Sequence, residues 1–116
     1  MSKKWMLTTL VNLGFTETDA QVYVFLATET PQKARDIAET LKISKQQLYR
    51  TLKKLQSKGV INASPEYPAH FSAVLFEKVL DLFVKAKTEQ QRALQESMEE
   101  LLSTWLFITK KDAPKN

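Results

Sequence analysis

The chain has 116 residues, of which 43% are hydrophobic and 26% charged, with 17 basic against 13 acidic side chains. This composition is typical of one folded domain rather than of a disordered or fibrous chain. The absence of cysteine excludes a disulfide framework and a thiolate metal site, and two glycines are too few for a glycine-rich phosphate-binding loop.

The apolar runs are far shorter than the ~20 residues that cross a bilayer. Near the N-terminus the apolar stretch is interrupted by Thr8, Thr9 and Asn12, which is unlike an export signal. We therefore expect a protein that is neither exported nor inserted in a membrane, with a cytoplasmic location.

The positive charge is concentrated in one segment of the chain. Residues 31–58 hold eight basic side chains against Asp36 and Glu39, whereas the segments on either side are weakly acidic. Such a local basic field is typical of a surface that contacts nucleic acid. A basic helix face that is merely solvated is the alternative.

Two helices are predicted at the start of the chain. The first is short and ends before Gly14, because glycine readily adopts the left-handed conformation found after helix C-termini. The second covers residues 17–28: Thr16 is its predicted N-cap, and Asp19 lies three positions later, as in a capping box.

Two further helices follow in the basic segment. One begins near Lys33 and stops near Lys42, with apolar residues at a period of 3.6. The next begins after Ser44, which with Gln47 has the S-x-x-Q capping pattern, and runs to Gly59. Its apolar stripe consists of Leu48, Leu52 and Leu55.

The second half of the sequence changes character twice. Residues 59–73 predict two short strands joined by a turn at 64–68, because β-branched Val60 and Ile61 precede Ser-Pro-Glu-Tyr-Pro and residues 70–73 resume an extended pattern. Residues 76–109 predict one long helix, in which five residues at heptad spacing form a dimerisation seam: Leu94, Met98, Leu101, Trp105 and Ile108. Packing of this seam within its own chain is the alternative. The last segment, 110–116, is predicted to be a disordered basic tail.

This order of elements predicts a mainly α fold with a small β-hairpin wing: a winged helix-turn-helix over residues 1–75, followed by the long dimerisation helix. The turn between the two central helices is expected to be packed by Ile37, Ala38, Leu41, Ile43 and Leu48. The opposite face of the second of these helices then carries Lys45, Gln46, Tyr49, Arg50, Lys53 and Lys54. Arginine and glutamine can read guanine and adenine in the major groove, and lysine and tyrosine can contact phosphates. Lys33, Arg35 and Ser44 complete the predicted DNA-binding set.

Three segments carry a family resemblance: LGFTETDAQVY at 13–23, ARDIA at 34–38 and SKQQLYRTL at 44–52, followed by Leu55, Lys58, Gly59 and Val60. Together they resemble the N-terminal DNA-binding domain of TrmB-like archaeal and bacterial transcription regulators. The resemblance implies a winged-helix homodimer whose recognition helix is 45–58, with Gln46, Tyr49 and Arg50 toward the bases. MarR-like regulators, which share the winged helix and helical dimerisation, are a neighbouring possibility.

Two features differ from that family. Its members often continue into a sugar-binding domain, whereas this sequence ends after the long helix, so no small-molecule effector is predicted. Their wing is usually basic, whereas residues 64–70 contain no lysine or arginine. Tyr67 is interpreted here as a turn residue that caps the hairpin, with stacking at the wing tip as the alternative. His70 is interpreted as a surface residue, with a phosphate or pH-sensitive contact as the alternative.

The sequence therefore predicts a prokaryotic, nucleoid-associated homodimer that reads double-stranded DNA and regulates transcription without a cofactor. A winged-helix module that binds protein within a larger assembly is the alternative. An enzyme is disfavoured, because no nucleophile–base pair, phosphate loop or metal cluster is present.

Overall fold

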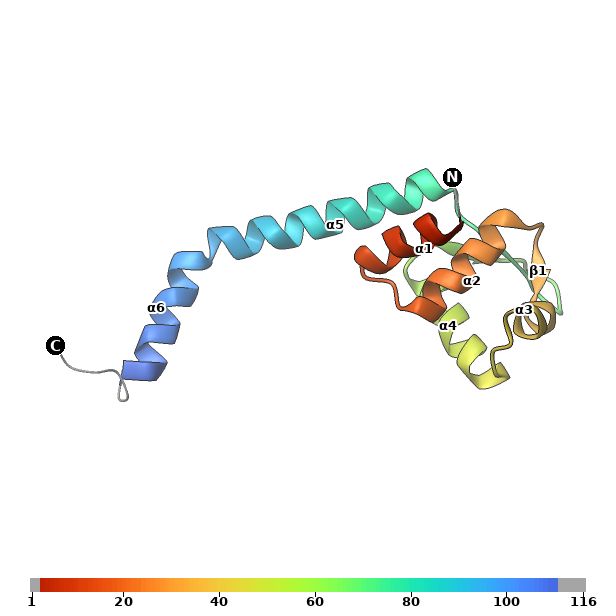
Figure 1. Cartoon of the computed structure of the whole chain (residues 1–116), viewed down its shortest axis with the longest axis horizontal. Helices are drawn as coiled ribbons and strands as arrows, with labels where there is room; N and C mark the ends of the chain where they lie inside the picture. Colours follow the sequence, from red (N-terminus) through yellow and green to blue (C-terminus); the bar gives the residue numbers. More distant parts are fainter. Residues whose placement is uncertain (1–2, 111–116) are drawn as a thin grey trace. The chain divides into compact units, whose positions relative to one another are not determined.

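The computed structural model describes residues 3–110, which form two compact units divided between Phe83 and Val84 (Figure 1). The predicted basic tail, apart from Lys110, lies outside the described residues. Along the chain the elements are α1 (Lys3–Asn12), α2 (Glu17–Thr28), β1 (Gln32–Lys33), α3 (Ala34–Leu41), α4 (Lys45–Ser57), β2 (Ile61–Ala63), β3 (His70–Ala73), α5 (Phe76–Glu96) and α6 (Met98–Thr109). No helix among residues 3–110 is long and apolar enough to cross a membrane.

The predicted capping box of α2 is confirmed. The Thr16 side chain accepts a hydrogen bond from the Asp19 amide at 3.1 Å, and Asp19 Oδ2 accepts one from the Thr16 amide at 3.5 Å. Gly14, which precedes this cap, has φ +110°, a conformation that side chains with a Cβ rarely adopt. The sequence therefore sets both the end of α1 and the start of α2.

Only half of the second predicted capping box forms. Ser44 Oγ accepts a hydrogen bond from the Gln47 amide at 3.2 Å, so Ser44 is the N-cap of α4. The Gln47 side chain does not complete the box: its Nε2 donates instead to Thr18 Oγ1 at 3.3 Å. This residue therefore joins α4 to α2, a partner that local sequence spacing does not indicate.

The sheet has three antiparallel strands in the order β1-β3-β2, whereas the sequence predicted two. The additional strand β1 pairs Gln32 with Phe71 and Lys33 with His70. A strand of two residues is too short to show an alternating pattern, so only its pairing with β3 reveals it. Pairing of Ile61 with Ala73 and of Ala63 with Phe71 joins the two strands of the wing.

The core of the first unit lies where α2, α4 and the sheet meet. Ile37 and Leu48 are buried and Ala38, Leu41 and Ile43 pack against the core, so the predicted helix-turn-helix contact is confirmed. Tyr23 of α2 is also buried, and its hydroxyl donates to the Val74 carbonyl oxygen at 2.6 Å. Burial raises the pKa of Tyr23 to about 12, because the phenolate would lose its hydration.

The long C-terminal helix is interrupted, and the prediction of one continuous helix over 76–109 is wrong. Ser97 separates α5 from α6, with φ −91° and ψ 1°, far from the helical ψ of about −42°. The sequence does contain a signal for this break. Ser97 and Glu100 have the S-x-x-E spacing of a helix start, although the Ser97 side chain makes no capping hydrogen bond.

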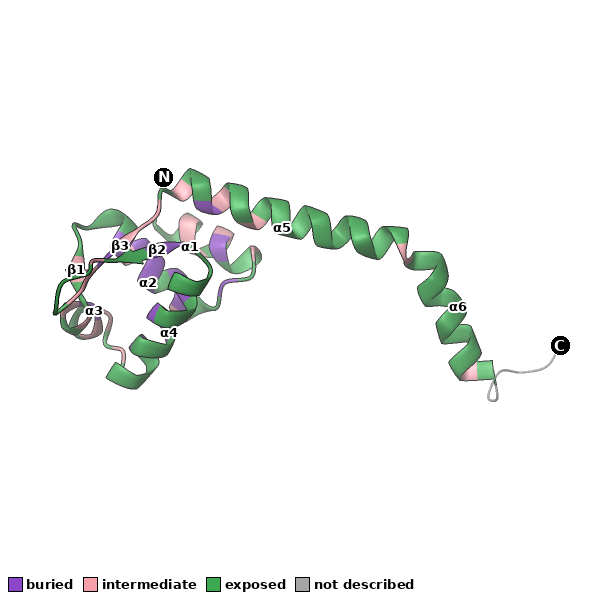
Figure 2. Cartoon of the chain, turned by 180° about the vertical axis from the view of Figure 1, so that it is seen from behind, coloured by how far each residue is buried: buried purple, intermediate pink, exposed green. Residues whose placement is uncertain are grey.

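Figure 2 shows that buried residues belong to the first unit, whereas exposed residues dominate the rest of α5 and α6. Val79 is the buried residue of α5, and α6 has none.

Candidate nucleic-acid interface

Helix α4 separates its apolar and polar residues onto two sides. Leu48, Leu52 and Leu55 are buried against the first unit. The six predicted reading residues are all exposed: Lys45, Gln46, Tyr49, Arg50, Lys53 and Lys54. The exposed side therefore offers cations, a phenol and an amide on one rigid helix.

Part of this face borders a hollow between α3, α4 and the wing, which we call the basic hollow. Its volume is about 470 Å³, and it is lined by Lys33, Arg35, Lys45, Tyr49 and Tyr67 together with Ala34, Leu48, Pro68, Ala69 and Phe71. Three of the predicted contact cations, which are up to 12 positions apart in sequence, thus line one concave surface. A concave surface with several cations concentrates positive potential, which favours a phosphate backbone.

Lys54 and Arg50 lie on the other flank of α4. With Thr16, Thr18, Asp19, Gln47 and Thr51 they line a second hollow, of about 400 Å³, between α2 and α4. Lys54 Nζ lies 2.8 Å from Oδ2 of the buried Asp19. The Lys54 charge is therefore engaged in holding α4 to α2.

Three further predicted DNA-binding residues, Gln46, Lys53 and Ser44, lie on α4 or at its N-terminus. Gln46 and Lys53 lie on the exposed side of α4 and line neither hollow. Ser44 accepts the N-cap hydrogen bond through its hydroxyl oxygen, which leaves its O–H proton available to donate.

The tip of the wing differs from its sequence-based interpretation. Tyr67 is 98% exposed, so it does not cap the hairpin as expected. The hairpin is closed lower down: the Ser64 amide donates to the His70 carbonyl oxygen and the His70 amide to Ser64 Oγ, each at 2.9 Å. His70 itself is half-buried. A short polar residue at the base of the loop makes the aromatic cap unnecessary.

Comparison with known proteins identifies the family of this chain. The sequence model described as "Sugar-specific transcriptional regulator TrmB" matches residues 10–77, more than half of the chain and most of the first unit. This chain belongs to the TrmB family. The family is one of transcriptional regulators.

Solved structures show that the TrmB-family chain has a winged-helix fold. TrmBL2, an archaeal chromatin protein, matches with a TM-score of 0.78 at 20% identity, over 99% of this chain and 45% of that one. A possible transcriptional regulator from Methanosarcina mazei Go1 matches with a TM-score of 0.66 at 15% identity, over 79% and 83% of the two chains. A MarR family transcription regulator matches with a TM-score of 0.55 at 13% identity, over 96% and 84%. A search of curated proteins finds no match.

The family match of this TrmB-family chain ends at residue 77, in the first turn of α5, so it does not reach the predicted seam. The five seam residues Leu94, Met98, Leu101, Trp105 and Ile108 are 52% to 65% exposed. Leu94 precedes the break at Ser97 and the other four follow it. Sequence reasoning overlooked Leu102, Leu106 and Phe107, which are also exposed and widen the apolar surface of α6. Their signal is the apolar run Trp105–Ile108, which exceeds a two-position heptad seam.

Proposed function

We propose that this chain is a sequence-specific double-stranded DNA-binding transcriptional regulator that acts as a homodimer and places α4 in the major groove. The observation that carries the proposal is the rigid exposed side of α4, bordered by the basic hollow. An α-helix fits the major groove of B-DNA, and a neighbouring concave cluster of cations suits the strand beside it.

The exposed residues divide into readers and anchors. Arg50 and Gln46 are assigned to base edges, because arginine pairs with guanine and glutamine with adenine through two hydrogen bonds. Lys33, Arg35, Lys45 and Lys53, with Ser44 and Tyr49, are assigned to phosphates. Because Lys54 is paired with Asp19, we assign it mainly to the α2–α4 contact, with a smaller share in binding.

The homodimer is proposed from the apolar surface of α6. Large apolar side chains that are exposed on one helix and contiguous along it mark an interaction site rather than ordinary surface. A second copy supplies the same surface in a two-fold arrangement. Two α4 helices then read an inverted repeat, with half-sites about one or two helical turns apart. Location with the nucleoid follows from this DNA partner.

Titration of a fluorescent duplex at several salt concentrations tests the proposal. A dimer that neutralises about 6 to 10 phosphates should give a slope of log affinity against log salt near −5 to −9. The duplex comes from selection by the protein among random sequences, and a single half-site is the control. A slope near zero, or equal affinity for one half-site and the full repeat, would contradict the dimeric reader and favour the protein-binding module.

A further inference from the structure

The wing presents one large aromatic side chain to solvent at a position where a charged anchor is absent. Tyr67 is 98% exposed, and residues 64–70 contain no lysine or arginine. The neighbouring Glu66 is exposed and would repel a phosphate. If the wing contacts a nucleic acid, it therefore does so through the Tyr67 ring rather than through charge. Rings of this kind stack on sugars and bases, and tyrosine adds a hydroxyl that can donate a hydrogen bond.

The loop that carries Tyr67 is held at its base. Both hydrogen bonds between Ser64 and His70 close the hairpin just below the tip, and β3 is paired on its two sides by β1 and β2. Phe71, the next residue of β3, is buried in the core. The backbone of the tip is thus attached to a rigid sheet, so less conformational entropy is lost when the tip binds.

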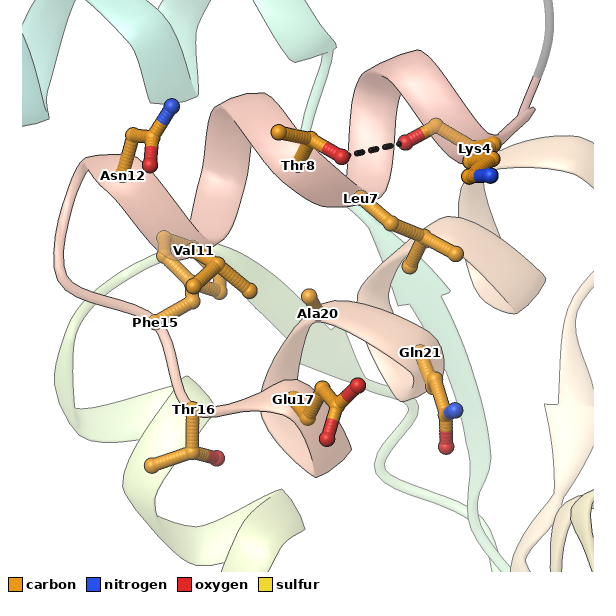
Figure 3. A pocket seen from close by; sticks show the side chains of 10 residues that line it. All are labelled: Lys4, Leu7, Thr8, Val11, Asn12, Phe15, Thr16, Glu17, Ala20 and Gln21. Atoms are coloured by element: carbon orange, nitrogen blue, oxygen red, sulfur yellow. Dashed lines mark hydrogen bonds between the residues drawn. The ribbon is translucent and has the colours of Figure 1, made fainter.

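The basic hollow relates this tip to α4. Tyr67 lines it from the wing, Lys45 and Tyr49 line it from α4, and Lys33 and Arg35 line it from the start of α3. By contrast, the α2–α4 hollow and two further hollows of the first unit do not combine α4 with the wing. The apolar groove between α1 and α2 contains Leu7, Val11, Phe15 and Ala20 (Figure 3), and nothing there points to an occupant. The hollow on the far side of the wing contains His70 and Glu66 but no Lys or Arg.

The lining of the basic hollow by both α4 and the wing indicates where the wing would lie on DNA. This inference rests on the proposed function. With α4 in the major groove, the strand that borders this groove passes through the basic hollow, where Lys33, Arg35 and Lys45 meet its phosphates. On the wing side of this phosphate backbone the hollow is lined by Tyr67. In B-DNA the other side of the same backbone borders the adjacent minor groove. This groove is about 6 Å wide, which admits an aromatic ring edge-on.

We propose that Tyr67 enters the minor groove beside each half-site and contacts the sugars and base edges there, as the specificity-determining residue of the wing. The expected preference is for A·T pairs at the contacted position. The amino group at N2 of guanine projects into the minor groove, where it would collide with the ring, whereas A·T pairs leave that space open. Apolar side chains that enter the minor groove are a known means of contact without base-specific hydrogen bonds.

Base substitution tests which groove is read. The duplex selected by the wild-type protein is prepared with A·T, G·C or inosine·cytosine at each pair flanking the half-site. Inosine·cytosine presents a G·C-like major groove but lacks the N2 amino group, so its minor groove resembles that of A·T. The wild-type protein should bind the A·T and inosine·cytosine duplexes alike at one flanking position and the G·C duplex more weakly.

Variants of Tyr67 assign this preference to the wing. Tyr67→Ala should weaken binding to the A·T duplex about tenfold, which corresponds to about 1.4 kcal/mol, and should remove the preference. Tyr67→Phe, the matched control, should keep both the affinity and the preference. Lys45→Ala should instead reduce the magnitude of the salt slope by about two, one for each copy in the dimer, and leave the preference intact. Because Tyr67 is almost fully exposed, its replacement should leave the circular dichroism spectrum unchanged.

The outcomes separate this inference from the proposed function. Salt-dependent binding by the wild-type protein with no change in Tyr67→Ala would overturn the role of Tyr67 alone. The same holds if the inosine·cytosine duplex behaves like G·C, because the flanking pair is then read from the major groove. Absence of salt-dependent binding to every duplex would overturn the proposed function and this inference together, and would indicate that the tip serves a protein partner.

Discussion

Helices α4 and α6 both carry large apolar side chains at helical spacing, but those of α4 are buried and those of α6 are exposed. The apolar stripe of α4 is narrow and is backed by lysine, arginine and glutamine, whereas the apolar residues of α6 form a wider face with Glu99, Glu100, Ser103 and Thr104 on the other side. A wide apolar helix face is stable in water when a neighbour covers it. Among the described residues α6 buries none of its own, which supports the proposed second copy as the surface that covers it.

The comparison shows that the same periodic signal has two meanings. In α4 the apolar face packs against elements of the same chain, namely α2, α3 and β2. In α6 the apolar face is the surface proposed to pack against a second copy of the chain. Periodicity reports that a face is apolar, and only the surrounding elements determine what covers it.

The largest expected effect is on association. Trp105→Glu introduces a charge into the middle of the proposed seam, where it would be buried without a partner, so we expect a dimer to become a monomer. Ser103→Glu is the matched control, because Ser103 is exposed on the opposite side of α6. Sedimentation velocity measures both variants. A fully dimeric Trp105→Glu protein would show that α6 is not the main interface.

The next effect separates burial within the chain from burial between chains. Leu52 is 2% exposed and Leu102 is 56% exposed, although both lie on apolar helix faces. Leu52→Ala should lower the free energy of unfolding by about 2 to 5 kcal/mol, because it leaves a cavity in the core. Leu102→Ala should leave the stability of the monomeric Trp105→Glu background within about 0.5 kcal/mol. Urea unfolding of each pair gives the two values, and equal losses would mean that α6 packs within its own chain.

A smaller effect tests the exposed side of α4. Arg50→Ala should cost about 1 to 3 kcal/mol on the preferred duplex and relax the preference at one base pair. Lys53→Ala should weaken binding to all sequences similarly, because a phosphate contact carries no sequence information. Binding isotherms on the selected duplex and its single-pair variants measure this difference. Equal, sequence-independent losses would transfer the base-reading role from Arg50 to Gln46.

The smallest effect concerns the hydrogen bond that joins α2 to the segment after β3. Tyr23→Phe should cost about 1 kcal/mol at neutral pH, the usual net value of one hydrogen bond. The folded pKa of Tyr23, about 12, lies above the ordinary tyrosine value of 10.0. Its contribution is thus fully present below the unfolded pKa and is lost as pH rises through the folded value. The free energy of unfolding of the wild type should fall more steeply with rising pH in this alkaline range than that of Tyr23→Phe. Parallel pH profiles would contradict the role of this hydroxyl.

Local chemistry in the sequence was sufficient to predict most of the secondary structure of the first unit. Gly14 and Gly59 need positive φ, Thr16 and Ser44 cap helices, and the leucine stripe of α4 points inward, so helix bounds and the helix-turn-helix contact were predicted from neighbouring residues. The exposed residues of α4 followed directly, because the position opposite a buried stripe is fixed by helix geometry. These features depend on interactions across three or four residues.

Tertiary structure alone decided the features that depend on residues far apart in the chain. The pairing of β1 with β3, the ion pair of Lys54 with Asp19, and the turn of Gln47 toward Thr18 each join segments that sequence spacing does not relate. The same is true of the basic hollow, which combines α3, α4 and the exposed Tyr67 of the wing. Such contacts form because the packed core places particular backbones beside one another, and a single sequence records the apolar faces but not which of them meet.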